Sequence, residues 1–339
     1  MVRHKTNQRK HQNYRHGVLG EDSSLSAVIC LEKKSKQRQF SVLPKPPEFT
    51  GTLEPNQELT NAEILLMDEI IGPESIAIHE KIKLYMLHLK MAKLVKGFKL
   101  TQQYDQLCDG SYHSLPKCGR PLGIRFSRQN PDLLIIADAY HGFFEANFQH
   151  GTIRQFLKPG TKITYGSSSP VIHFNDFDIS QNGRHIIFTE PSHRFMDRDC
   201  FYAMAEHRPD GRLLDYNMHT GELRVLVDNL YYPNGVEFDR TGKCVFLPKW
   251  AIYCFTYKFE KYTVVASNLP GYPDNIRTSN NGMLWVPLGH VRLKDDSWIT
   301  ERPFLRNIVA MATELDDGTI LLGGDNNMFL ARFKPSKML

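Results

Sequence analysis

The chain has 339 residues, a formal net charge of +5 and a hydrophobic content of 41%. This composition allows a packed core and argues against global disorder. No stretch reaches the roughly 18–20 consecutive apolar residues that a membrane-spanning helix needs, and the polar, basic start predicts no signal peptide. An integral membrane protein is therefore not expected.

The first segment of the chain is basic. Residues 1–40 contain nine Lys or Arg against three acidic residues, a net charge of +6, so residues 41–339 carry −1. We interpret residues 1–45 as a solvated, disordered head, because polar side chains interleave the charges without an amphipathic period. Its two functional interpretations are a nucleic-acid arm and peripheral association with an anionic membrane. We expect that the head does not bind nucleic acid, and peripheral membrane association remains the functional interpretation.

The body, residues 46–335, follows a proline-rich joint at Leu43–Pro47. A helix is expected over Asn61–Ile71, with Thr60 as its N-cap. Beyond it, one pattern recurs: a polar residue, a short apolar strand, a polar turn and a second apolar strand. Such units begin at residues 74, 121, 175, 234, 274 and 313. Several of their turns are Asn-Gly or Asp-Gly, which is the strongest short hairpin signal.

The spacing of these units predicts the fold class. Successive units begin 39 to 59 residues apart, and four-stranded propeller blades repeat at about 40–50 residues. We therefore predict an all-β fold, a six-bladed β-propeller. A β-sandwich of irregular hairpins is the alternative, but sandwiches seldom repeat one polar-then-apolar strand start six times.

The polar residues that open the units predict a metal site. In a propeller the innermost strands line a central channel, so equivalent positions converge on one axis. These positions include Glu74, Asn175, Asn234, Asp274 and Asn275. Two carboxylates and three amide oxygens suit calcium, whereas zinc would favour His and Cys. The structural alternative is that each side chain caps a turn at its strand start.

Longer motifs follow one another in order along the chain. They are Gly72–Ala77 (GPESIA), Cys118–Ile124 (CGRPLGI), Ala137–Tyr140 (ADAY), Asn175-Asp176, Asp210–Leu214 (DGRLL), Tyr232–Val236 (YPNGV) and Gly271–Arg277 (GYPDNIR). Together they resemble the strictosidine synthase-like family, six-bladed propellers related to paraoxonases and gluconolactonases. The resemblance implies arylesterase- or lactonase-type hydrolysis of a small-molecule ester or lactone, with calcium in the channel. By the paraoxonase pattern, the calcium ligands are the same five residues.

Three features depart from that family pattern. Leu122 stands where paraoxonases place a proposed catalytic histidine, and a leucine cannot take a proton. The family usually starts with a membrane anchor, where this chain has the basic head. Only Phe304–Ala312 separates the Glu-Arg-Pro motif at residues 301–303 from the last unit, so the fifth and last blades are expected to be incomplete. The resemblance implies an endomembrane, secretory or membrane-associated location.

Candidate catalytic residues follow from the predicted site. Asp274 is the best candidate for a carboxylate that acts as general base for water beside the metal. Strand alternation puts His173 on the same side as Asn175, so His173 could substitute for the lost histidine. Six aromatic residues near channel motifs could form an acyl or aryl pocket, although core packing is their commoner use. They are Tyr140, Phe143, Phe144, Tyr231, Tyr232 and Tyr272.

Two other functions are considered beside the hydrolase, and two cysteine pairs are expected to form disulfides. A non-catalytic propeller with structural calcium, acting as a binding module, is the second hypothesis. A true strictosidine synthase is less expected, because that enzyme uses a glutamate near the end of the chain, in a stretch largely missing here. The family resemblance implies a Cys108–Cys118 disulfide and an oxidising compartment. A Cys244–Cys254 pair rests only on the expected register of a hairpin.

Overall fold

The computed structural model describes residues 44–54, 58–68, 72–79, 85–88, 108, 110–147, 149–206, 208–248, 251–256, 259, 261–291, 311–324 and 330–335. The predicted basic head and the shortened stretch before the last unit lie outside the described residues, apart from their last one or two positions. The predicted domain boundary therefore stays a prediction.

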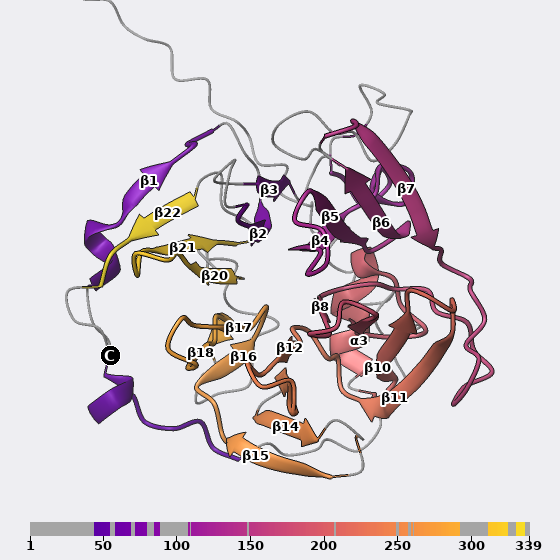
Figure 1. Cartoon of the computed structure of the whole chain (residues 1–339). Coiled ribbons are helices and arrows are strands. Elements are labelled where there is room, and N and C mark those ends of the chain that lie inside the picture. Colours follow the sequence, from indigo (N-terminus) through magenta and orange to yellow (C-terminus); the bar gives the residue numbers. More distant parts are fainter. Residues whose placement is uncertain are drawn as a thin grey trace, which may run out of the picture.

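The strands form antiparallel sheets arranged as propeller blades around a common axis (Figure 1). The second blade contains β4 (Pro121–Phe126), β5 (Leu133–Asp138), β6 (Gly142–Asn147) and β7 (Thr152–Leu157). The third contains β8 (Phe177–Ile179), β9 (His185–Glu190), β10 (Gly211–Asn217) and β11 (Leu223–Leu230). The fourth contains β12 (Glu237–Phe238), β13 (Cys244–Pro248), β14 (Ile252–Thr256) and β15 (Tyr262–Ala266). In each, neighbours in sequence pair in space.

The other blades are built from shorter pieces. The first pairs β2 (Pro73–Ala77) with β3 (Tyr85–His88). The fifth pairs β16 (Gly271–Pro273) with β19 (Leu288–Val291), and β17 (Arg277–Thr278) with β18 (Leu284–Trp285). The last blade joins β20 (Met311–Glu314), β21 (Ile320–Gly323) and β22 (Leu330–Phe333) to β1 (Glu63–Leu65).

The inner strands form a closed ring. Strand β2 contacts β20 and β4, β8 contacts β4 and β12, and β12 contacts β17. Between the fifth and last blades, the Asn280 backbone N–H donates to the Glu314 carboxylate (3.2 Å), and the Asn280 side-chain amide donates to the Leu315 carbonyl (2.8 Å). The predicted all-β propeller is confirmed.

The N-terminal part of the body corrects two predictions. The expected helix over Asn61–Ile71 is wrong: Glu63–Leu65 form β1, preceded by the short 3₁₀ helix η2 (Glu58–Asn61). Pairing with β22 outweighs the local helix preference, as tertiary contacts often do. The last blade is therefore not incomplete, because β1 supplies its fourth strand. Incompleteness of the fifth blade stays a prediction, because residues 292–310 lie outside the described ranges.

The core lies between adjacent blades. Strands β5 and β9 are buried along almost their whole length, since their two faces pack against neighbouring sheets. Phe143 is fully buried and packs edge-to-face against Phe174, Phe177 and Phe188, with ring centroids 5.1–5.6 Å apart. Phe144 belongs to a second buried cluster. For these two residues the pocket interpretation is therefore wrong, and core packing holds.

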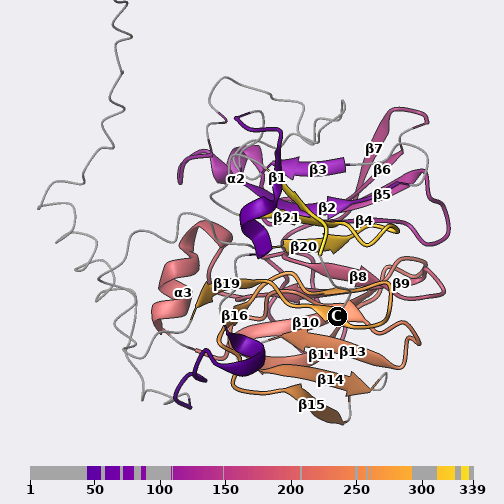
Figure 2. The ribbon, with the colours of Figure 1, turned by 90° about the vertical axis from the view of Figure 1, so that its left-hand side faces the viewer.

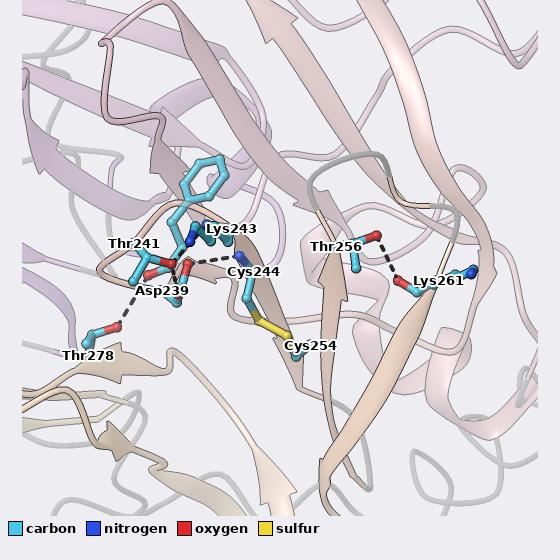
Figure 3. Close-up of a disulfide and its surroundings, with 9 residues drawn as sticks. Asp239, Thr241, Lys243, Cys244, Cys254, Thr256, Lys261 and Thr278 are labelled. Carbon is cyan, nitrogen blue, oxygen red and sulfur yellow. Dashed lines mark hydrogen bonds between the residues drawn. A yellow bond between two sulfur atoms is a disulfide. The ribbon is translucent and has the colours of Figure 1, made fainter.

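Both expected disulfides are present, Cys108–Cys118 and Cys244–Cys254. The second joins β13 and β14, and Figure 3 shows it beside the turn that precedes β13. In that turn Asp239 accepts a hydrogen bond from the Cys244 backbone N–H (2.8 Å), and Gly242 adopts a left-handed φ of 66°. The Asp239–Gly242 turn therefore joins β12 and β13 as a hairpin, because glycine takes this left-handed conformation without strain.

Candidate metal centre

The five predicted ligand residues lie at the same end of the inner strands. Glu74 lies in β2, Asn175 and Asn234 precede β8 and β12, and Asp274 and Asn275 lie between β16 and β17. Strand alternation and the blade repeat therefore bring them to one mouth of the channel, as the sequence predicts.

One direct contact joins two of these positions, and a second joins the neighbour of Asn234 to the segment that carries Asp274 and Asn275. The Asn275 side-chain amide donates to the Glu74 carbonyl (3.1 Å), which links the fifth blade to the first. A Cβ added at Gly235 would lie 2.6 Å from the Asp274 carbonyl oxygen, so the loop after Asn234 packs directly on the segment that carries Asp274 and Asn275. Only glycine allows this close approach of two backbones.

Three amide oxygens in this set are buried and have no hydrogen-bond partner among the residues that the structure describes. They are the Oδ1 atoms of Asn175, Asn234 and Asn275. Asn175, Asn275 and the Glu74 side chain are at most 6% exposed. A buried polar atom without a partner costs about 1–3 kcal/mol, so native structures rarely contain several together. Amide oxygens that accept no hydrogen bond are free to act as ligands, and hard cations such as calcium prefer oxygen ligands.

The site differs from a His/Cys or all-carboxylate centre. Within the described ranges, no group of three or more His, Cys, Asp or Glu side chains could hold a metal ion. A cation bound at the predicted positions would have the amide oxygens among its ligands, together with the carboxylates of Glu74 and Asp274. This composition fits the predicted oxygen-only shell, and it is a poor match to zinc.

His173 lies two residues before Asn175 in the chain. It is fully buried, and among the described residues neither ring nitrogen has a hydrogen-bond partner. Burial lowers the pKa of its imidazole to about 4, partly offset by the Asp197 charge. The ring is therefore neutral at pH 7 and carries one N–H donor and one acceptor nitrogen.

A short helical segment, called the roof below, lies over the third blade on one face of the propeller (Figure 1). It comprises η3 (Asp197–Asp199) and α3 (Cys200–Glu206), and Figure 2 shows α3 on the same face of the propeller as α2 (Leu115–Cys118). Burial raises the pKa of Tyr232 well above its ordinary value, and Cys200, Asp197 and Asp274 add to the shift. Tyr232 therefore lies close to the roof and to Asp274, one of the predicted ligands.

The roof is fastened to the second blade. Arg120 pairs with Asp197 at 2.5 Å, and the Arg198 backbone N–H donates to the Tyr140 hydroxyl (2.7 Å). Of the aromatic residues expected in a substrate pocket, Tyr140 and Tyr232 are the two placed at the roof. No pattern in the sequence predicts this segment, because neither short helix has the length or period of an amphipathic helix.

Leu122, at the position of the family histidine, is 2% exposed. It packs in an apolar cluster with Leu115, Ala139 and Tyr140, against which Met196 also lies. The position at which the paraoxonase pattern has a histidine is therefore apolar in this structure and has no group that could carry a proton.

A cavity lies at the opposite mouth of the channel. Its volume is about 270 Å³, and its lining includes Arg125, Asp178, Glu237 and Thr313. Asp178 and Glu237 each lie three residues after a predicted ligand, Asn175 and Asn234. None of the five predicted ligands lines it. Burial raises the pKa of Glu237 to about 7, and the Asp178 charge adds to this shift while Arg125 opposes it.

The loop that leads into Asn175 is held by a buried ion pair that sequence reasoning missed. The Glu190 carboxylate accepts hydrogen bonds from the backbone N–H groups of Ile172 (2.8 Å) and His173 (3.4 Å). Arg212 donates to Glu190 (2.6 Å) and to the Pro170 carbonyl (3.0 Å). A paired Glu and Arg on adjacent strands looks like an ordinary cross-strand pair in sequence, so only the fold shows its role.

Comparison with known proteins agrees with this description. The strictosidine synthase family profile matches residues 175–264, and the profile of the strictosidine synthase-like N-terminal region matches residues 51–86. The chain is 32% identical over 297 residues to adipocyte plasma membrane-associated protein of Bos taurus, covering 84% of this chain and 71% of the relative. The corresponding figures for Homo sapiens are 32%, 84% and 70%.

A solved structure shares the fold. The gluconolactonase from Xanthomonas campestris superposes with a TM-score of 0.55 at 16% identity, over 86% of this chain and 95% of that one. At this identity the likeness shows the propeller fold alone. In the part of the chain that the structure describes, no helix is long and apolar enough to cross a membrane.

Proposed function

Because this chain belongs to the strictosidine synthase-like family, with the adipocyte plasma membrane-associated proteins among its relatives, we propose that it is a calcium-binding hydrolase of the esterase or lactonase type. The observation that carries the proposal is the trio of buried amide oxygens without hydrogen-bond partners, on Asn175, Asn234 and Asn275. Glu74 and Asp274 complete the proposed ligand set. A small-molecule ester or lactone is the proposed substrate class.

The proposed chemistry divides between the ion and the chain. When bound, calcium would act as a weak Lewis acid toward the carbonyl oxygen of an ester. Asp274, one of the two carboxylates of the set, is the proposed general base for the attacking water. The neutral His173 ring can donate or accept one hydrogen bond to substrate. The roof segment, fastened by Arg120 and Asp197, would exclude bulk water from the bound ester.

A non-catalytic propeller is the second candidate function, and Leu122 favours it. That side chain is packed among apolar residues and provides no proton carrier at the family's histidine position. In this alternative, calcium cross-links the blades and a surface of the propeller binds a partner. Both candidate functions include bound calcium, but only the hydrolase would turn over an ester or lactone.

The test begins with the metal. Elemental analysis of the purified full chain should find calcium, and calcium titration after chelation should give one strong site that Asn234→Ala weakens. Asn217→Ala is the matched control, because Asn217 caps a turn by accepting bonds from His219 and Thr220 backbone N–H groups (2.9 and 3.1 Å). Zinc, or no metal, would contradict the ligand assignment.

Turnover separates the two candidates. Aryl esters and lactones should be hydrolysed above background by the calcium-loaded protein, and Asp274→Asn should abolish the excess rate. If calcium raises the melting temperature but no ester or lactone is turned over, the hydrolase proposal fails and the binding-module alternative holds.

Membrane association is proposed for the basic head, by charge alone. The net charge of +6 on residues 1–40 would attract an anionic bilayer by about 1 kcal/mol per basic residue near the surface. The full chain should sediment with vesicles containing anionic lipid and not with neutral vesicles, and the binding should weaken as salt rises. Binding that is indifferent to lipid charge would contradict this proposal.

A further inference from the structure

A hydrogen-bonded network lies directly below the proposed metal ligands. Its centre is Asp176, which is fully buried and pairs with the Arg277 guanidinium through both carboxylate oxygens (2.7 and 3.1 Å). The same carboxylate accepts a hydrogen bond from the Val236 backbone N–H (3.2 Å). This one side chain thus joins the inner segments of the third, fourth and fifth blades.

The network continues into the first two blades. Arg277 approaches the Ser75 hydroxyl oxygen at 3.5 Å, and that oxygen accepts a hydrogen bond from the Ile124 backbone N–H (3.3 Å). Arg277 also donates to the Ile276 carbonyl (2.7 Å). Ser75 is fully buried and Arg277 is 7% exposed. The network therefore links five blades: the Arg277 guanidinium contacts Ser75 and Asp176 directly, and these two residues bind the backbone of the second and fourth blades.

Four side chains or backbone groups of this network lie one or two residues after a proposed ligand. Ser75 follows Glu74, and Asp176 follows Asn175. Val236 and Arg277 each lie two residues after an asparagine of the set, Asn234 and Asn275. Consecutive Cα atoms are about 3.8 Å apart, so a shift in the network moves the ligand layer with it.

We propose that Arg277 is a positioning residue of the metal centre: its guanidinium, paired with Asp176, fixes the spacing at which four blades present their oxygen ligands. This inference rests on the proposed function, because it presupposes that the oxygens bind calcium. Arginine is required because its planar fork can pair with both carboxylate oxygens and reach Ser75 at once, whereas a lysine ammonium is a point charge on a flexible stem.

The experiment compares calcium affinity in variants of the full chain. After chelation, calcium is titrated by calorimetry into the wild type, Arg277→Lys and Arg125→Lys. Arg125 is the matched control: it is an arginine of the same channel, donates to Glu237 (3.0 Å) and lies 3.8 Å from Asp176. Removing outer partners of metal ligands typically weakens metal affinity 10- to 100-fold. We expect about a 10-fold or larger loss for Arg277→Lys and about twofold or less for Arg125→Lys.

A milder variant covers the case in which Arg277→Lys does not fold. Ser75→Ala removes only the hydroxyl that Arg277 and Ile124 share, and we expect it to weaken calcium binding several-fold with little change in melting temperature. Melting temperatures of the calcium-free proteins, measured in parallel, separate loss of affinity from loss of fold.

The outcomes distinguish the two proposals. If the wild type binds no calcium, the proposed function fails and the positioning role fails with it. If the wild type binds calcium and folded Arg277→Lys binds it equally well, only the positioning role is overturned. Equal losses in Arg277→Lys and Arg125→Lys would also overturn it, because general damage to the channel would then explain both. If Arg277→Lys does not fold, unchanged affinity in Ser75→Ala overturns it.

Discussion

Replacing Arg212 by methionine should destabilise the protein far more than replacing an exposed arginine. Arg212 is 1% exposed and Glu190, its ion-pair partner, is fully buried. Methionine fills most of the space but leaves the Glu190 carboxylate without its compensating charge. Removing one partner of a buried ion pair costs about 3–5 kcal/mol, because the remaining charge is neither solvated nor paired.

The loss should be measurable by two methods. With roughly 2–4 °C per kcal/mol for a domain of this size, the melting temperature should fall by about 6–20 °C. Denaturant unfolding at pH 7 gives the free energy directly. Arg224→Met is the control, since Arg224 pairs with Asp215 (2.8 Å) but its side chain is 46% exposed, and exposed pairs contribute about 0–1 kcal/mol.

A double variant tests the cause. Glu190→Gln removes the buried charge, so adding it to Arg212→Met should recover part of the lost stability. The reasoning is refuted if Arg212→Met costs no more than Arg224→Met. It is also refuted if the double variant is as unstable as the sum of the two single variants, because no coupling between the charges would then exist.

Three further predictions concern stability. Cys118→Ser opens the loop that the disulfide with Cys108 closes over a separation of 10 residues, and should lower the free energy of unfolding by roughly 2.5–3 kcal/mol in non-reducing denaturation; equal stability would refute this. Burial raises the pKa of Glu237 to about 7 from its ordinary 4.5. The folded state therefore binds that proton more tightly, and the resulting stability, present below pH 4.5, is lost as the pH rises through about 7. Glu237→Gln should accordingly flatten the fall in melting temperature between about pH 5 and 8, and a parallel curve would contradict the assignment. Arg332→Ala breaks the exposed pair with Glu63 that joins β22 to β1, yet should change unfolding by under about 1 kcal/mol; a larger loss would show that β1 depends on this pair.

Much of the propeller could be predicted because its signals are local. The turn at Gln181–Gly183 separates β8 from β9 as expected, and Gly183 has a φ of 68°. The five proposed ligands could be singled out from the sequence because four of them open a unit of the repeat and Asn275 follows Asp274, so their equivalence needed no knowledge of distances. Of the two disulfides, Cys108–Cys118 was expected from the family resemblance and Cys244–Cys254 from the register of a hairpin.

The rest depends on contacts between distant segments. Strand β1 forms only because β22, almost 270 residues later, offers a pairing edge. The Asp176–Arg277 pair joins residues 101 apart, and nothing in either local sequence distinguishes it from an ordinary surface charge. The roof is held by the pair of Arg120 and Asp197, two residues 77 positions apart that no motif connects.

The layer of proposed ligands and the Asp176–Arg277 network beside it can both be explained by the way in which propeller blades contact one another. Each propeller blade packs mainly on its two neighbours, so few contacts connect blades across the axis. Here the Asp176–Arg277 pair joins inner segments on different blades, and the proposed cation would join Glu74, Asn175 and Asn234 in the layer above. A ligand that binds only the folded ring stabilises it by about 2.7 kcal/mol at 100 times its dissociation constant. The buried amide oxygens, costly in the absence of a cation, are therefore best understood as the means by which metal binding would stabilise closure of the ring.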